Sequence, residues 1–396
     1  MGPLHGVRVL DVGTAMAGPY SAALMADLGA EVIKVEKPLR GDLIRHTDRN
    51  VRGQSGYFLG LNRGKLGMTA DLRTAEGQAI IAELVKEADI LVENYRGGTM
   101  ETWNLGYDRL KAINPGLIYC SLSMFPDDVP GYDHLVGNDK VAQAITGLMD
   151  NTGDADGMPT RLGAPIVDAA GGFLCAIGVL AALHQRSVTG IGDHVHVSLL
   201  EAAYALMPPW IPSILNSDVN FTRQGHKHPL LAPYQLYETS DGCYMVIGAF
   251  HQESWRRLCA AIHREDLLED ERFASNFDRV ENRDVLDPII EAEIRTRPAA
   301  EWQSILEELV VPAAPVLSIR ESIERFTSAA PQMVVETIHD ELGAIRMLRP
   351  PIRLSSEDEP VVPKASPLLG QDADRILADL GYDEAAIEGL RARKVI

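Results

Sequence analysis

The sequence predicts an α/β fold, in which a large domain built on a mostly parallel β-sheet is combined with a smaller α+β domain. Three observations lead to this prediction. The chain has 396 residues, more than one hydrophobic core usually supports, which favours two domains. Buried-strand patterns alternate with amphipathic-helix patterns through residues 7–121, as is typical of a parallel sheet with helices on both faces. After Pro208 and Pro209 the elements become shorter, which indicates a second domain.

The first third of the chain reads as successive βαβ units. The predicted strands cover residues 7–12, 31–36, 89–93 and 117–121. The predicted helices cover residues 19–28, 74–88 and 99–113. Gly29 follows the first helix as a stop signal, and Glu76 lies in the first turn of the second. In such a sheet, ligands bind at the carboxyl ends of the strands.

The remaining elements divide between a small domain and a returning tail. Further strands are predicted at residues 243–248, 334–338 and 345–348. Further helices are predicted at residues 251–262, 285–294, 299–309, 371–380 and 384–393. We therefore assign residues 225–328 to the smaller domain and residues 209–224 to a linker. Residues 1–208 and 330–396 make up the large domain.

Composition excludes several classes of partner. The chain carries 37 Lys and Arg against 56 Asp and Glu, a net charge of −19, which opposes binding to nucleic acid or to an anionic membrane. Its first residues lack the basic flank and apolar core of a signal peptide, and the apolar run at 173–183 is too short to span a bilayer. We therefore expect a cytoplasmic protein that does not bind membranes.

The cysteines and histidines do not predict a metal site. The four cysteines lie far apart without CxxC spacing, mostly in apolar surroundings, and are expected to be reduced core residues; they are Cys120, Cys175, Cys243 and Cys259. His226 and His228 have no carboxylate or cysteine nearby in the sequence, which favours a structural turn over a metal site.

Asp168 is the most informative side chain. It is the only charged residue between Arg161 and His184, and a long apolar run follows it. A carboxylate among small and apolar residues is partly desolvated and more reactive, and an aspartate can act as a nucleophile toward acyl groups. The alternative interpretation is that Asp168 caps the helix that begins there. Local sequence leaves both open.

The turn between the first strand and the first helix is a candidate ligand site. Ala15, Met16 and Ala17 occupy the place where a doubly wound fold binds nucleotides, but the segment lacks GxGxxG, which disfavours an ordinary dinucleotide site. Small residues allow a ligand close to the backbone, and the following helix N-terminus favours anions. A tight structural turn is the alternative.

Motifs spread along almost the whole chain resemble those of the class III CoA-transferases, the family of formyl-CoA transferase. They are VLD at 9–11, AGP at 17–19, LGAEVIKVE at 28–36, LNRGK at 61–65, DILVENYR at 89–96, TGIGD at 189–193 and PLLGQ at 367–371. The resemblance implies a Rossmann-like large domain and an interlocked homodimer. It places the family's catalytic aspartate at Asp168.

The resemblance also implies a reaction. CoA moves from an acyl-CoA to a carboxylic acid through an acyl anhydride on Asp168 and then a thioester between Asp168 and CoA, with CoA as a substrate and no permanently bound cofactor. Backbone N–H groups must stabilise the tetrahedral oxyanions, and Gly171 and Gly172 are candidates by proximity, unless they serve helix packing. The expected CoA-binding residues are Ala15, Met16, Ala17, Lys37, Arg40, Lys65, Asn94, Tyr95 and Arg96. Lys37 and Lys65 would meet phosphates, although any single cation could be a solvated surface charge.

Two alternatives remain. A racemase of 2-methylacyl-CoA in the same superfamily pairs the aspartate with a histidine in a Gly-His-Asp motif, but here that stretch reads Gly131, Tyr132, Asp133, and only the adjacent His134 could take the role. A CoA-binding paralogue without turnover is the other alternative.

Overall fold

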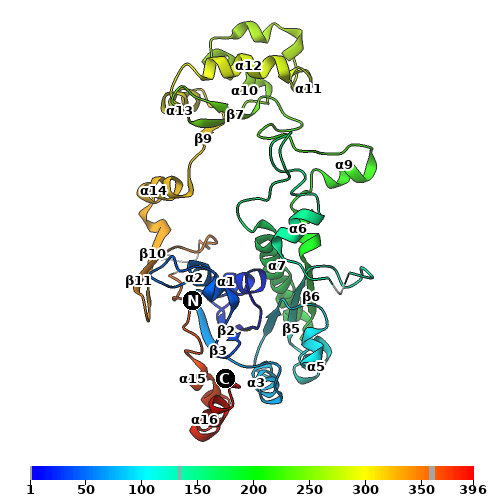
Figure 1. Ribbon diagram of the computed structural model, residues 1–396, viewed down its shortest axis with the longest axis vertical. Helices are drawn as coiled ribbons and strands as arrows, with labels where there is room; N and C mark the ends of the chain where they lie inside the picture. The colour runs from blue at the N-terminus through cyan, green and yellow to red at the C-terminus, as the bar shows by residue number, and fades with distance from the viewer. Residues whose placement is uncertain (1, 133–134, 356–361) are drawn as a thin grey trace. The chain divides into compact units, whose positions relative to one another are not determined.

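A six-stranded parallel sheet forms the centre of the large part of the molecule (Figure 1). The computed structural model describes residues 2–132, 135–355 and 362–396. The strands are β1 (Arg8–Asp11), β2 (Glu31–Glu36), β3 (Lys65–Thr69), β4 (Ile90–Glu93), β5 (Ile118–Ser123) and β6 (His194–Ser198). Their order, β3-β2-β1-β4-β5-β6, is that of a doubly wound sheet, which confirms the predicted α/β class. The order reverses between β1 and β4, so a ligand crevice is expected at the carboxyl ends of these two strands.

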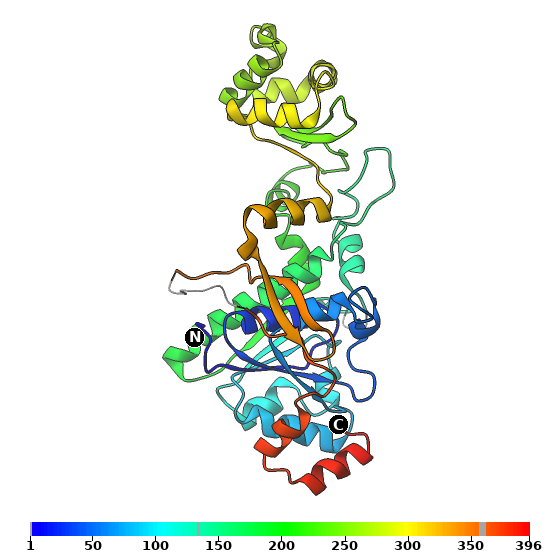
Figure 2. The same cartoon turned by 90° about the vertical axis from the view of Figure 1, so that its left-hand side faces the viewer.

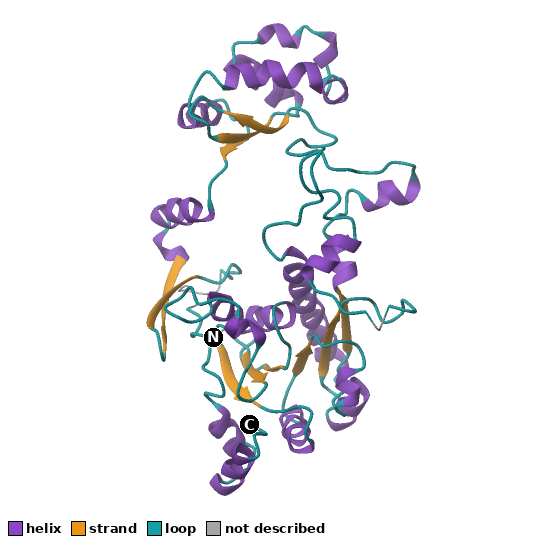
Figure 3. Cartoon of the chain, in the orientation of Figure 1, coloured by secondary structure: helices purple, strands orange, loops and turns teal. Residues whose placement is uncertain are grey.

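Helices cover both faces of this sheet (Figure 3). One face is covered by α1 (Ala17–Asp27) and α7 (Ile166–Thr189), which pack closely against each other. The other face carries α3 (Ala75–Val85), α5 (Tyr107–Ile113), α15 (Ala373–Asp379) and α16 (Glu384–Ala392), whose apolar side chains share one core with the strands. The remaining helices of this unit are α2 (Gly56–Leu61), α4 (Thr99–Thr102), α6 (Asp139–Ile145) and α8 (Leu199–Ala205).

Local signals explain where these elements begin and end. Thr74 caps α3 by accepting a hydrogen bond from the Gly77 N–H, and Gly29, with φ of +99°, ends the turn after α1. The predicted helix at 99–113 is two helices, because Asn104 has φ of +56° and interrupts the helical path. The chain returns to the sheet through the antiparallel pair β10 (Val334–His339) and β11 (Gly343–Leu348), drawn in orange in Figure 2.

The second unit comprises residues 147–161 and 213–329. Its three-stranded antiparallel sheet consists of β7 (Tyr234–Glu238), β8 (Tyr244–Gly248) and β9 (Ala313–Pro315). Its helices are α10 (Gln252–Ala261), α11 (Asn276–Glu281), α12 (Arg283–Ile294), α13 (Ala299–Glu308) and α14 (Ile319–Ala329), and α9 (Ile211–Asn216) leads into it. Trp255 and Trp302 fill its core.

Residues 147–161 lie in this second unit, whereas the sequence placed them in the large domain. The reason is local pairing: the Gly225 N–H donates to the Gly153 carbonyl over 3.0 Å, and Arg223 binds the carboxylate of Asp150 at 2.7 Å. These contacts join two segments far apart in the sequence. Pattern reading cannot detect them, because neither segment forms a regular helix or strand there.

The helix α7 is longer than its apolar run suggested. It has 24 residues, and by length and composition alone it would be able to cross a membrane. In this fold it packs instead on α1, β5, β6 and α8.

Candidate active site

Asp168 lies in the first turn of α7, and it does not cap that helix. The N-cap position is Pro165, which makes no side-chain cap bond. The cap is supplied by Asp139 of α6, whose Oδ2 accepts hydrogen bonds from the N–H groups of Val167 (2.8 Å) and Asp168 (3.2 Å). The N-cap interpretation of Asp168 is therefore wrong. The Asp168 side chain is therefore not used to bind the N–H groups at the start of α7.

Asp139 was not identified from the sequence. It is buried, and Gln143 one turn later donates to its Oδ1 over 2.6 Å. The oxygen of the same Gln143 amide accepts from the N–H of Leu162, which ties the start of α7 to α6. Asn138 and Asp139 open an amphipathic stretch after an irregular loop, and this was the only signal in the sequence for a helix there.

The pKa of Asp168 is raised to about 7, first because the half-buried carboxyl group is desolvated and second because the negative charge of Asp139 lies nearby. Among the residues that the structure describes, none donates a hydrogen bond to the Asp168 carboxylate. A carboxylate that is desolvated, close to another anion and without hydrogen-bond donors is poorly stabilised in its charged form. It is therefore suited to act as a nucleophile near neutral pH.

This pKa gives a pH-dependent stability prediction for Asp168→Asn. Between the unfolded pKa of 3.8 and the folded value of about 7, the folded state binds more protons than the unfolded state, so wild-type stability falls as the pH rises through this window. Asparagine does not ionise and escapes this loss. We expect the free energy of unfolding of Asp168→Asn, measured relative to that of wild type, to increase by about 1 to 3 kcal/mol between pH 5 and pH 8.

Denaturant unfolding of wild type and Asp168→Asn in parallel at several pH values measures this difference. A gap between the two proteins that stays constant over the range would contradict the raised pKa.

A cavity of about 310 Å³, here called the Asp168 cavity, opens in front of this carboxylate. It is lined by residues 14–17, 94–97, 122–127, 132, 135–138, 168 and 199. The start of α1 forms part of its wall and carries neither a side-chain cap nor an acidic residue in its first turn. Because the first N–H groups of a helix lack partners within the helix, this end offers donors to an anion in the cavity.

Tyr57 on α2 is a second residue that the sequence did not indicate. Its hydroxyl donates to the sulfur of Met16 over 3.2 Å. Burial raises the pKa of Tyr57, and the charges of Asp168 and Asp139 raise it further, so this phenol lies within electrostatic reach of both carboxylates.

Gly171 and Gly172 serve packing. Both lie in the second turn of α7, where N–H groups bond to carbonyls of the preceding turn and are not free to stabilise an oxyanion. A Cβ at Gly171 would come within 2.9 Å of a Leu122 methyl group, and one at Gly172 would lie 3.1 Å from the Ala17 carbonyl oxygen. The glycines thus allow α1 and β5 to approach α7, as the packing alternative stated.

A second cavity of about 430 Å³, here called the Lys37 cavity, lies at the carboxyl ends of β1, β2 and β3. Lys37 and Arg40 line it, and neither forms an ion pair with another described residue. Tyr95 and Trp103 also line it. Their rings are in edge-to-face contact, with the ring centroids 4.9 Å apart. Thr14 and Tyr95 belong to the walls of both cavities.

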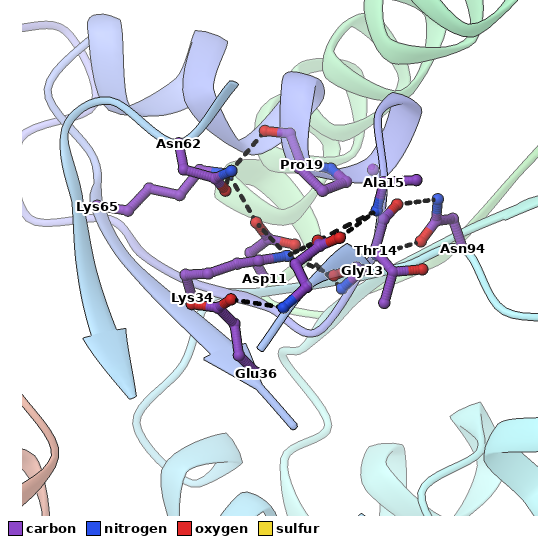
Figure 4. Close-up of polar contacts among 12 residues, drawn as sticks. Asp11, Gly13, Thr14, Ala15, Pro19, Lys34, Glu36, Asn62, Lys65 and Asn94 are labelled. Atoms are coloured by element: carbon purple, nitrogen blue, oxygen red, sulfur yellow. Dashed lines mark hydrogen bonds and ion pairs between the residues drawn. The ribbon is translucent and has the colours of Figure 1, made fainter. Parts of the chain in front are cut away.

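The turn that separates the two cavities is held by buried polar groups (Figure 4). The amide of Asn94 clamps Thr14, accepting from its N–H over 2.7 Å and donating to its carbonyl over 2.8 Å. Asp11 accepts from the Gly13 N–H over 3.0 Å. Asn94 therefore shapes the cavity wall with both ends of its side chain, in addition to lining the cavity.

Lys65 corrects a prediction. It was expected to meet a CoA phosphate, but its side chain is fully buried and lines neither cavity. Its ammonium donates to Asp11 Oδ2 (2.7 Å), the Pro19 carbonyl (2.8 Å) and Asn62 Oδ1 (2.8 Å). All three of its N–H donors are used inside the fold. Lys65 therefore stabilises the turn after β1 and the start of α1, and it does not bind a ligand directly.

The other predicted ligand-binding residues lie at the two cavities. Ala15, Met16, Ala17, Asn94, Tyr95 and Arg96 line the Asp168 cavity. Lys37 and Arg40 line the Lys37 cavity. Their roles toward CoA stay predictions.

His134, on which the racemase alternative depends, lies outside the described residues. Cys120, Cys175 and Cys259 are buried, but Cys243 is exposed, because it lies in the tight turn between β7 and β8 and not in the core.

The comparisons with known proteins agree with one another. The profile of CoA-transferase family III matches residues 4–373. The succinyl-CoA–D-citramalate CoA-transferase of Chloroflexus aurantiacus is 37% identical, over 100% of this chain and 98% of that protein. The succinyl-CoA:glutarate CoA-transferase of Mus musculus is 35% identical, over 100% of this chain and 91% of that protein.

A crystal structure of a CaiB/BaiF family protein from Brucella suis superposes with a TM-score of 0.83 at 34% identity, covering 96% of this chain and 99% of that chain. The chain is thus matched over its full length in sequence and over 96% of its length in fold. It belongs to CoA-transferase family III and is a transferase that moves CoA between an acyl-CoA and a carboxylic acid.

Proposed function

We propose that this transferase works through covalent catalysis by Asp168, with succinyl-CoA as donor and a second dicarboxylic acid as acceptor. The mechanism is supported by the surroundings of Asp168. Its carboxylate has a pKa of about 7 and lines a cavity, and none of the described residues donates a hydrogen bond to it. The choice of donor rests on the relatives, several of which are named for succinyl-CoA.

The reaction has four balanced steps. An oxygen of Asp168 attacks the thioester carbon, the C–S bond breaks, and CoA thiolate leaves an acyl anhydride on the enzyme. The thiolate then attacks the aspartyl carbonyl and releases the donor acid, leaving a thioester between Asp168 and CoA. The acceptor carboxylate attacks that thioester and expels the thiolate again. Finally the thiolate attacks the acceptor acyl carbon, which frees the Asp168 carboxylate.

Each step passes through a tetrahedral oxyanion, and the start of α1 is our candidate for its stabilisation. Met16 and Ala17 line the cavity, and they stand at the positive end of the α1 dipole, where the backbone N–H groups of a helix are free to donate. The Met16 side chain adds no charge that would compete for an anionic substrate.

The Lys37 cavity is suited to the nucleotide part of CoA. Lys37 and Arg40 supply positive charge in an acidic protein, and Tyr95 and Trp103 supply aromatic surface for an adenine ring. Since Thr14 and Tyr95 line both cavities, the pantetheine arm would cross from one to the other beside the turn at residues 13–16.

The direct test is a transfer assay with succinyl-CoA and a panel of free acids, read by mass spectrometry of the CoA thioesters. The panel should include citramalate, glutarate, mesaconate and oxalate. We expect a new thioester with one or more dicarboxylic acids. If succinyl-CoA gives no product with any acid while another acyl-CoA does, the proposed donor is wrong.

We further propose that the enzyme is a homodimer, as the family resemblance implies. The outer face of α7 carries large apolar side chains in the isolated chain: Phe173 is 45% exposed, Ile177 is 62% and Val188 is 79%. A second copy would cover such a face. Light scattering is expected to give twice the chain mass of 43.2 kDa. A single species at the chain mass would refute the dimer.

A further inference from the structure

Asp42 contacts the walls of both cavities. With Arg40 and Gly41 it lines the Lys37 cavity. Its two carboxylate oxygens each accept from the N–H of Ala15 at 3.1 Å, and Ala15 lines the Asp168 cavity. One side chain therefore joins the loop after β2 to the turn before α1.

Buried charges fix this carboxylate in place. Lys34 Nζ lies 3.4 Å from Asp42 Oδ2 and 3.6 Å from Asp11 Oδ2, and all three side chains are buried. The same ammonium donates to the Gly13 carbonyl, as Figure 4 shows. The Asp42 N–H donates to Glu36 Oε1 over 2.8 Å. Because these groups are rigidly tied, a displacement of the loop at Asp42 must be passed to the turn.

The turn has a conformation that depends on this support. Ala15 has φ of +59°, in the left-handed region that non-glycine residues avoid. In this conformation its N–H donates to Asp42, which adds to the support that Asn94 gives at Thr14, and α1 begins two residues later at Ala17. The direction of the first N–H groups of α1 therefore depends on Asp42.

We propose that Asp42 is a positioning residue that couples the Lys37 cavity to the Asp168 cavity, so that binding of the CoA nucleotide speeds acyl transfer at Asp168. The proposal rests on the proposed function, in which the nucleotide occupies the Lys37 cavity. It follows the general rule that binding energy from non-reacting parts of a substrate can be used at the reacting centre. The nucleotide then raises kcat and not only affinity.

The first test compares succinyl-CoA with succinyl-pantetheine, which lacks the nucleotide, in wild type and Asp42→Asn. Asparagine keeps the shape but removes the charge that pairs with Lys34. We expect the variant to slow both thioesters, because the turn at Ala15 loses part of its support, but to slow succinyl-CoA about tenfold or more beyond succinyl-pantetheine, mainly in kcat.

The matched control is Asp27→Asn. Asp27 is also buried and ion-paired, with Arg63, but it lies at the far end of α1 and lines neither of the two cavities. It should leave the ratio of the two substrates unchanged. If Asp42→Asn lowers kcat/KM for both substrates by the same factor, or changes only KM, Asp42 is merely structural or a simple ligand contact and the proposal fails.

A second test uses the wild-type protein and therefore does not depend on folding of a variant. The probe is 3′-phosphoadenosine 5′-diphosphate, the nucleotide part of CoA, and the readout is hydrogen exchange. We expect exchange at residues 15–17 to slow by about threefold or more, although the probe is too short to fill the Asp168 cavity. Protection at residues 37–43 without any at 15–17 would overturn the coupling.

Failure of the proposed function has a different signature. In that case wild type would show no transfer, or Asp168→Ala would keep it, whatever the behaviour of Asp42.

Discussion

Asp168→Ala abolishes CoA transfer, with an expected loss in kcat on the order of 10⁴-fold or more. The carboxylate is the group that forms both covalent bonds of the proposed cycle, and alanine can form neither. Because removal of a desolvated charge relieves the folded state, the variant should remain folded at neutral pH. Steady-state transfer from succinyl-CoA to the accepted acid measures the effect.

Asp127→Asn is the matched control for this experiment. Asp127 also lines the Asp168 cavity, but its carboxylate is exposed and paired with His196 at 2.8 Å. We expect its replacement to cost less than about tenfold. If the Asp168 variant stays active while the Asp127 variant does not, the nucleophile has been assigned to the wrong carboxylate.

Lys65→Met destabilises the large unit by about 3 to 5 kcal/mol. Removal of its ammonium takes away a partner at 2.7 Å from the fully buried Asp11 carboxylate, which then has, among the residues that the structure describes, the Gly13 N–H at hydrogen-bond distance and Lys34 Nζ at 3.6 Å. A buried charge that loses its closest partner is among the most costly single defects in a folded protein. Denaturant unfolding followed by circular dichroism reports the loss.

Lys37→Met separates this structural role from ligand binding. Both lysines were expected from the sequence to meet phosphates, but Lys37 is exposed and lines the Lys37 cavity. Its replacement should change stability by no more than about 0.5 kcal/mol and raise KM for the CoA thioester. A Lys65→Met protein with wild-type stability and weakened CoA binding would restore the original assignment of Lys65.

Lys37 and Lys65 show what the sequence could and could not predict. Four strands of the large sheet, β1, β2, β4 and β5, were predictable because they are apolar runs separated by amphipathic helices, whereas β3 and β6 were not predicted. The position of Lys65 was not readable. It is the first residue of β3, a short strand that begins with a charged residue and contains a glycine, so it gave no strand signal. Only the pairing of β2 with β3 brings its side chain beneath α1 and onto Asp11.

The site was predictable in part for the same reason. Asp168, the turn at 15–17 and the segment at 94–96 stand out locally, because each lies at the end of a strand or the start of a helix. Asp139, Tyr57 and Asp42 do not, because their roles depend on contacts with residues distant in sequence. An aspartate after a glycine in a loop looks like a surface turn until the structure shows Lys34 beside it.

The most direct test of the account is to trap the covalent enzyme. The protein is incubated with succinyl-CoA without acceptor, treated with hydroxylamine, digested with trypsin and analysed by mass spectrometry. The tryptic peptide of residues 162–186 contains Asp168 as its only side-chain carboxylate, so a hydroxamate on that peptide assigns the nucleophile without ambiguity. We predict this adduct. An unmodified peptide from an enzyme that still transfers CoA at its full rate would contradict the central claim.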